Sequence, residues 1–78
     1  MAEQRLSLTA LIREEDGLFS SLCVELDVAS CGNTEQEALE NLQDAVEVYL
    51  ETLREEGLLD EAVSRLASAK EATFEVSV

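Results

Sequence analysis

The sequence predicts an α+β fold with the element order β-β-β-α-α-β, formed by a single domain over residues 1–78. Three observations support this prediction. Residues 5–31 alternate between apolar and polar side chains and are interrupted by turn signals, which is typical of short strands. The middle of the chain has the apolar spacing of amphipathic helices, and the C-terminal segment ATFEVSV alternates again.

The N-terminal part is expected to form a three-stranded antiparallel meander. Residues 5–14, RLSLTALIRE, alternate as a half-buried strand does. Asp16-Gly17 is the dipeptide that favours a type I′ turn, which predicts a hairpin to a second strand over 18–24. The polar residues 25–27 then turn the chain into a short third strand over 28–31.

A long helix is expected to follow. Thr34 and Glu37 form a T-x-x-E capping box, in which each side chain satisfies a backbone N–H of the other residue. Gly57 is placed as a C′ glycine that ends the helix after about 22 residues. The apolar stripe of this helix consists of Ala38, Leu39, Leu42, Ala45, Val46, Tyr49 and Leu53.

A shorter helix and a fourth strand complete the prediction. Asp60 is expected to cap the shorter helix, whose inner side carries Leu59, Ala62, Val63 and Leu66. Residues 72–78 are expected to form a strand with Phe74, Val76 and Val78 on one face. A right-handed helical crossover would place this strand parallel to the first, in the spatial order 3-2-1-4.

Both helices are then expected on one face of the sheet, which leaves the other face open. That open face would carry Leu11 and, depending on the register, either the Phe19/Cys23 or the Leu22/Val24 set. A half-covered sheet in so short a chain favours a homo-oligomer, and we expect a homodimer or homotetramer.

Composition limits the function. The formal net charge of −13 repels phosphate backbones, so we expect no direct binding to nucleic acid, whereas a basic protein would be attracted. The N-terminal MAEQRLSL has no basic region followed by an apolar run, and no segment is apolar enough to span a membrane. With two cysteines only, the sequence predicts a cytoplasmic protein with no membrane association.

The sequence shows no catalytic constellation, and we expect that the protein is not an enzyme. It has no histidine to activate a serine, and no glycine-rich phosphate loop. An alternative is a metal-dependent nuclease that uses Asp16, Glu25 and Asp27, but all three fall in predicted turns. Cys23 and Cys31 are expected to be small buried apolar residues, so neither a metal nor a cofactor is predicted.

Residues 16–51 resemble the HicB-like antitoxin domain. The resemblance rests on Asp16-Gly17, the aromatic Phe19 and the segment 25–30, ELDVAS. It continues through Gly32-x-Thr34, the helix start at residues 37–42, EALENL, and the helix end at residues 49–51, YLE. It covers 36 of the 78 residues, and the predicted element order extends it to nearly the full chain.

The resemblance implies a partial ribonuclease-H-like fold without nuclease activity. It also implies a partner, a small basic HicA-type toxin that cleaves messenger RNA and that the antitoxin neutralises. Many relatives carry a C-terminal DNA-binding module. The sequence departs from this pattern because it stops at Val78, directly after the predicted fourth strand, and it has Val24 where the family often has proline. A solo domain without a toxin, with a regulatory or structural role through self-association, is therefore the alternative.

The candidate partner-binding residues are the acids on the outer side of the long helix. Glu40, Asp44, Glu47 and Glu51 lie opposite the apolar stripe. Like charges at i, i+4 cost a few tenths of a kcal/mol per pair in an isolated helix, and a basic partner would relieve this repulsion. The alternative is an ordinary solvated helix face.

Overall fold

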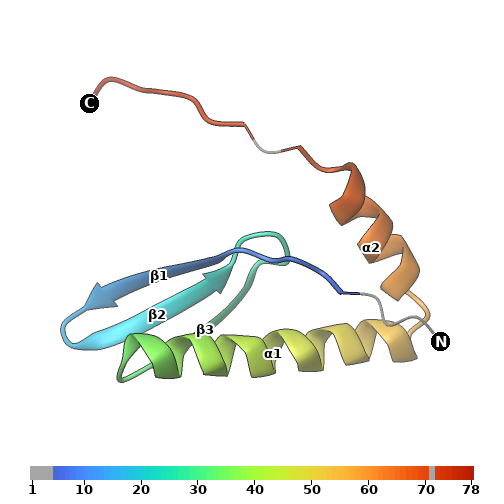
Figure 1. The fold of residues 1–78 in the computed structure, drawn as a ribbon, viewed down its shortest axis with the longest axis horizontal. Coiled ribbons are helices and arrows are strands. Elements are labelled where there is room, and N and C mark those ends of the chain that lie inside the picture. Colours follow the sequence, from blue (N-terminus) through green and yellow to red (C-terminus); the bar gives the residue numbers. More distant parts are fainter. Residues whose placement is uncertain (1–4, 71) are drawn as a thin grey trace.

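The computed structural model describes residues 5–70 and 72–78 and confirms the α+β class. Three strands, β1 (Ala10–Glu15), β2 (Leu18–Cys23) and β3 (Val28–Gly32), form an antiparallel sheet in the order β1-β2-β3. A long helix, α1 (Glu35–Glu55), lies along one face of the sheet, and a shorter helix, α2 (Leu59–Ser68), follows it (Figure 1). The three-stranded meander is thus confirmed.

The β1–β2 hairpin has the turn that its sequence predicts. Asp16 has φ 53° and Gly17 has φ 81°, the two positive values that a type I′ turn requires. β1 starts later than expected, at Ala10, although a backbone bond from Val24 N to Thr9 O of 3.0 Å extends the pairing by one residue.

The register decides which residues face α1. Ile12 pairs with Ser21, and Leu11 pairs with Leu22. Ser21 and Cys23 are each 2% exposed, and Ser21 Oγ donates a 2.9 Å hydrogen bond to the carbonyl oxygen of Ala38 in α1. Phe19 and Cys23 therefore lie on the helix side, and the open face carries Leu11 with Leu22, which resolves the two alternatives left by the sequence.

The hydrophobic core is small and lies between α1 and the middle of the sheet. Its buried centre consists of Cys23, Leu42 and Val46. Half-buried apolar residues pack around this centre, namely Leu8, Leu26, Val28 and Leu50. The predicted helix stripe is wider than the sheet beneath it, since Leu39 and Tyr49 remain 42% and 39% exposed.

Both ends of α1 are capped by local contacts. Thr34 Oγ1 accepts a 3.0 Å hydrogen bond from Glu37 N, which confirms the N-cap. The second bond of the predicted capping box is different, because the Glu37 carboxylate accepts from Asn33 N at 3.2 Å. At the other end, Gly57 has φ 74° and the N–H groups of Gly57 and Leu58 close a Schellman motif on Arg54 O and Leu53 O.

α2 starts without the side-chain cap that was expected. The prediction that Asp60 is the N-cap is wrong, because Leu58 occupies that position and Asp60 lies inside the first turn. The acid still lies next to the positive end of the helix dipole, where it stabilises the helix. The expected inner side is confirmed as half-buried, and no residue of α2 is fully buried.

Residues 72–78, here called the C-terminal tail, pair with no strand among the described residues, so the structure does not contain the fourth strand that was expected. The tail leaves α2 and runs away from the sheet and from α1 (Figure 1). Phe74 is 86% exposed and Val76 is 75% exposed. The alternation that predicted a strand is a property of the segment alone, whereas a strand needs a paired neighbour to satisfy its backbone.

Candidate partner-binding surface

An acidic surface covers the outer side of the C-terminal half of α1. Here the name acidic face is used for Asp44, Glu47, Glu51 and Glu55, which line a shallow surface hollow together with Val48 and Thr52. All four acids are exposed, and Val48 is 66% exposed at their centre. The hollow thus combines four carboxylates with one apolar side chain.

The helix period explains why these acids share a surface. Leu42 and Val46, on the opposite side, are buried against the sheet at 4% and 9% exposure. Residues at i, i+3 and i+4 are neighbours on a helix surface, so Asp44, Glu47 and Glu51 form one row. Burial of the apolar stripe therefore directs the acids to solvent.

The carboxylates of the acidic face have no compensating partner among the residues that the structure describes. Within residues 5–70 and 72–78, none of the four accepts a hydrogen bond or forms an ion pair, whereas Arg65 pairs with Glu61 at 2.6 Å in α2. The one basic residue of α1, Arg54, does not line the hollow. The negative field at this surface is therefore left uncompensated.

Three of the four residues predicted as partner-binding lie together in this hollow. Glu40, the fourth, lies outside it and accepts a 2.9 Å hydrogen bond from Gln36 Nε2. Sequence reasoning missed Glu55 and Val48. The i, i+4 spacing from Glu51 to Glu55, and from Asp44 to Val48, would have identified both.

A second polar cluster ties the β2–β3 turn to the residue that precedes β1. Glu25 accepts hydrogen bonds from Thr9 N at 2.8 Å and from Thr9 Oγ1 at 2.7 Å. These bonds, the backbone one first, lower the pKa of the Glu25 carboxyl below its ordinary value of 4.5. Glu25 is thus a structural clamp, a role that the sequence did not reveal.

Replacing Glu25 by glutamine is expected to lower the melting temperature at neutral pH. Because the folded-state pKa is lowered, the carboxylate contributes stability above the unfolded-state pKa and loses it as the pH falls through the folded-state value. The melting temperatures of the native chain and of Glu25→Gln should therefore differ at pH 7, and the difference should shrink as the pH falls below 4.5 and through the lowered folded-state pKa. Thermal melts followed by circular dichroism between pH 7 and pH 3 measure this, and a constant difference would contradict it.

The acids of the nuclease alternative are not brought together. Asp16 lies in the β1–β2 turn, and Glu25 and Asp27 lie at the other end of β2, a strand of six residues. At about 3.3 Å per residue, that strand separates the two turns by about 20 Å. Among the described residues, no three acidic or cysteine side chains are grouped as metal ligands would be.

The two cysteines lie on opposite faces of the sheet. Cys23 is buried in the core, as expected, but the prediction that Cys31 is buried is wrong, because its side chain is exposed. Cys31 pairs with Ser20, and Cys23 pairs with Val28. The two thiols are therefore not cross-strand neighbours.

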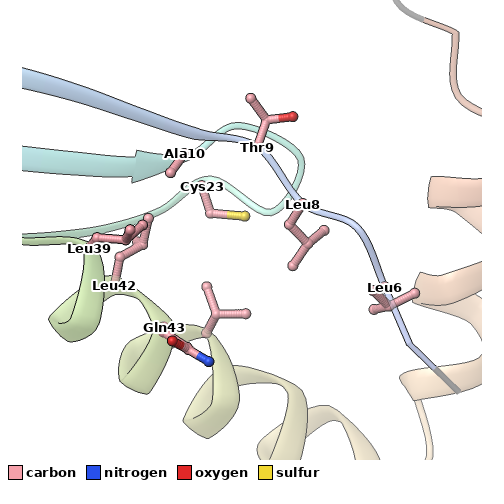
Figure 2. A pocket seen from close by; sticks show the side chains of 9 residues that line it. Leu6, Leu8, Thr9, Ala10, Cys23, Leu39, Leu42 and Gln43 are labelled. Carbon is pink, nitrogen blue, oxygen red and sulfur yellow. The ribbon is translucent and has the colours of Figure 1, made fainter. Parts of the chain in front are cut away.

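An apolar cavity of about 320 Å³ opens at the outer edge of β1, between that strand and α1. Figure 2 shows its walls, to which the segment before β1, the end of β2 and one side of α1 all contribute. The apolar side chains that line it include Leu8, Ala10, Cys23, Leu39 and Leu42. The cavity exists because the sheet ends at β1 while the apolar stripe of α1 continues beyond it.

The comparisons with known proteins give no relative. No protein-family model matches the chain, no curated protein matches it, and no solved structure matches it. Separately, no helix within the described part of the chain is long and apolar enough to cross a bilayer. The function is therefore inferred from the surfaces described above.

Proposed function

We propose that the protein is an antitoxin-type binding module of the HicB-like kind, which neutralises a small basic toxin that cleaves messenger RNA. The observation that carries this proposal is the acidic face, where four exposed carboxylates, which have no partner within residues 5–70 and 72–78, surround Val48. An RNA-cleaving protein needs a basic surface to hold phosphates. The carboxylates of the acidic face can bind this basic surface of the toxin in place of the RNA phosphates.

Electrostatics favour this pairing in two ways. The net charge of −13 speeds the approach of a basic protein, and complementary charges orient it on α1. Val48 supplies apolar contact at the centre of the carboxylates, where a partner would exclude water. Surface ion pairs alone contribute little, so this apolar centre is an essential part of the proposed site.

We also propose that the C-terminal tail becomes a fourth strand beside β1, in the order 3-2-1-4 of a partial ribonuclease-H-like sheet. The support is the cavity at the β1 edge, which is lined by apolar side chains on the face where Ala10 and Ile12 lie. Exposed Leu39 on α1 borders the same cavity. A strand with apolar residues facing α1 would cover these groups.

The proposed binding role is tested by capture from the native host with a tagged chain. The test variant is Asp44→Asn/Glu47→Gln/Glu51→Gln, and the control variant is Glu15→Gln/Glu56→Gln/Asp60→Asn, which removes three negative charges elsewhere on the surface. We expect the native chain and the control to retain a small basic protein that salt releases, and the test variant to lose it at least about tenfold. Equal capture by both variants would contradict the proposed site.

A second candidate is a solo domain of the same kind that works by self-association and has no toxin. The observations that favour it are the exposed apolar side chains of the tail, Phe74 and Val76, and the open edge of β1. In the same capture experiment this candidate predicts that the chain recovers only copies of itself. Recovery of a basic RNA-cleaving protein would exclude it.

A further inference from the structure

The chain exposes far more surface than a compact protein of its size. Its accessible area is 6635 Å², whereas a monomer of 8.5 kDa is expected to expose about 4,700 Å². Its radius of gyration is 14.7 Å, against about 11.5 Å for a compact 78-residue domain. The projecting tail and the thinly packed α2 account for the extended shape (Figure 1).

Two incomplete surfaces of the same chain complement each other. β1 is an edge strand, so one side of it has no paired neighbour among the described residues. The C-terminal tail is an extended segment with three exposed apolar residues at alternate positions, Phe74, Val76 and Val78. Such a segment is suited to pair with an exposed sheet edge through its backbone.

We propose that two copies of the chain exchange their tails, so that residues 72–78 of each copy form the fourth strand beside β1 of the other. The proposal rests on the fourth strand proposed above and names the copy that supplies it. A reciprocal exchange is two-fold symmetric and closes on itself, so it yields a dimer rather than a fibre. Each copy gives one strand and accepts one.

The apolar and charged residues that alternate along the tail match the side chains on the two faces of β1. With Phe74 and Val76 facing α1, the aromatic ring fills the cavity beside Ala10 that Leu39 and Leu42 also line (Figure 2). The next residue, Glu75, then points to the open face of the sheet. That face of β1 carries the guanidinium of Arg13, which has the opposite charge.

The position of the tail favours a second copy over the same chain. Ala69 leaves α2 with extended backbone angles, φ −74° and ψ 144°, and the tail beyond it stays separate from its own sheet (Figure 1). The sequence between Ser68 and the tail is short and contains no glycine. Exchange between copies uses the tail as it projects, and short connecting segments favour such swapping.

The excess exposed area is large enough to supply the interface of a stable dimer. The excess over a compact monomer is about 1,900 Å² per chain, so two chains would bury a little under 4,000 Å² if the exchange removed it. Permanent homodimers bury about 2,000–5,000 Å² in total. The exchanged segments are also apolar on one face, as the interfaces of such dimers are.

The first test is the mass of the full chain in solution, measured by light scattering after size-exclusion chromatography. We expect a mass of twice 8.5 kDa for the native chain and a monomer for Phe74→Asp/Val76→Asp. The control Ser77→Asp adds a charge on the opposite side of the tail and should leave the dimer intact. A monomeric native chain, or a dimer that persists in Phe74→Asp/Val76→Asp, would overturn the proposal.

The second test separates exchange between copies from pairing within one chain. A ¹⁵N-labelled Cys31→Ser chain is unfolded and refolded with an unlabelled Cys31→Ser/Ser77→Cys chain that carries a nitroxide at residue 77. We expect broadening of the β1 amide resonances in the ¹⁵N-labelled copy. No broadening there overturns the exchange. In a further sample, one chain carries both the ¹⁵N label and the nitroxide and is diluted into excess unlabelled native chain. Broadening of its β1 amide resonances then shows that the fourth strand forms within the chain, and its absence shows that the strand does not form.

Discussion

Replacing Gly32 by alanine is expected to lower the free energy of unfolding by about 3 kcal/mol, at the upper end of the range for overpacked sites. A Cβ on Gly32 would lie 2.5 Å from Ala38 N and 2.8 Å from the carbonyl carbon of Glu37. Both neighbours are backbone atoms of the first turn of α1, so no side-chain rotation relieves the clash. The end of β3 and the start of α1 would have to separate.

Gly57→Ala is the matched control for this prediction. The substitution is chemically identical, but a Cβ at Gly57 meets nothing within 4 Å, and only the left-handed φ of 74° opposes it. We expect a loss of about 1 kcal/mol. Urea unfolding of both variants measures the difference, and an equal or smaller loss for Gly32→Ala would show that β3 and α1 do not approach as closely as described.

Replacing Leu42 by alanine is expected to cost about 2–5 kcal/mol, the range for deletion of a buried leucine side chain. Leu42 is 4% exposed and packs in a small core cluster with Cys23 and Val46, so little else can fill the space. A domain of this size has a total stability of about 4–12 kcal/mol. The variant is therefore expected to lose a large share of its stability and to unfold at a much lower urea concentration than the native chain.

Val48→Ala on the acidic face is the control for Leu42→Ala. Val48 is 66% exposed, and its truncation is expected to change the free energy of unfolding by less than about 0.5 kcal/mol. Both variants should be unfolded in urea at one protein concentration, since the proposed self-association would make apparent stability depend on concentration. Comparable losses in the two variants would contradict the assignment of the core.

Local chemistry made most of the fold predictable. Asp16-Gly17 sets the hairpin because both residues accept positive φ, and Gly57 ends α1 for the same reason. Thr34 marks the N-terminus of α1 because its hydroxyl satisfies a backbone N–H that the helix leaves free. Each of these residues determines the conformation of the backbone only within a few positions of it in the sequence.

Contacts between distant residues were not predictable in the same way. The bond from Thr9 to Glu25 spans 16 residues, and the register that buries Cys23 but exposes Cys31 depends on pairing across the whole sheet. The tail shows most clearly what the sequence pattern does not predict. Its alternating residues predict a strand but do not identify the strand with which it pairs. For the acidic face, the helix period placed Asp44, Glu47 and Glu51 correctly, and the selection of residues stopped one turn before Glu55.

The central claim, that the chain neutralises a basic RNA-cleaving protein, is tested most directly by a cleavage assay. The small basic protein released by salt in the capture experiment is incubated with messenger RNA, alone and with increasing amounts of the native chain. We predict cleavage by the captured protein alone and its complete loss near one equivalent of the chain. Cleavage that persists at a large excess of the chain, or a captured protein that does not cleave RNA, would contradict the claim.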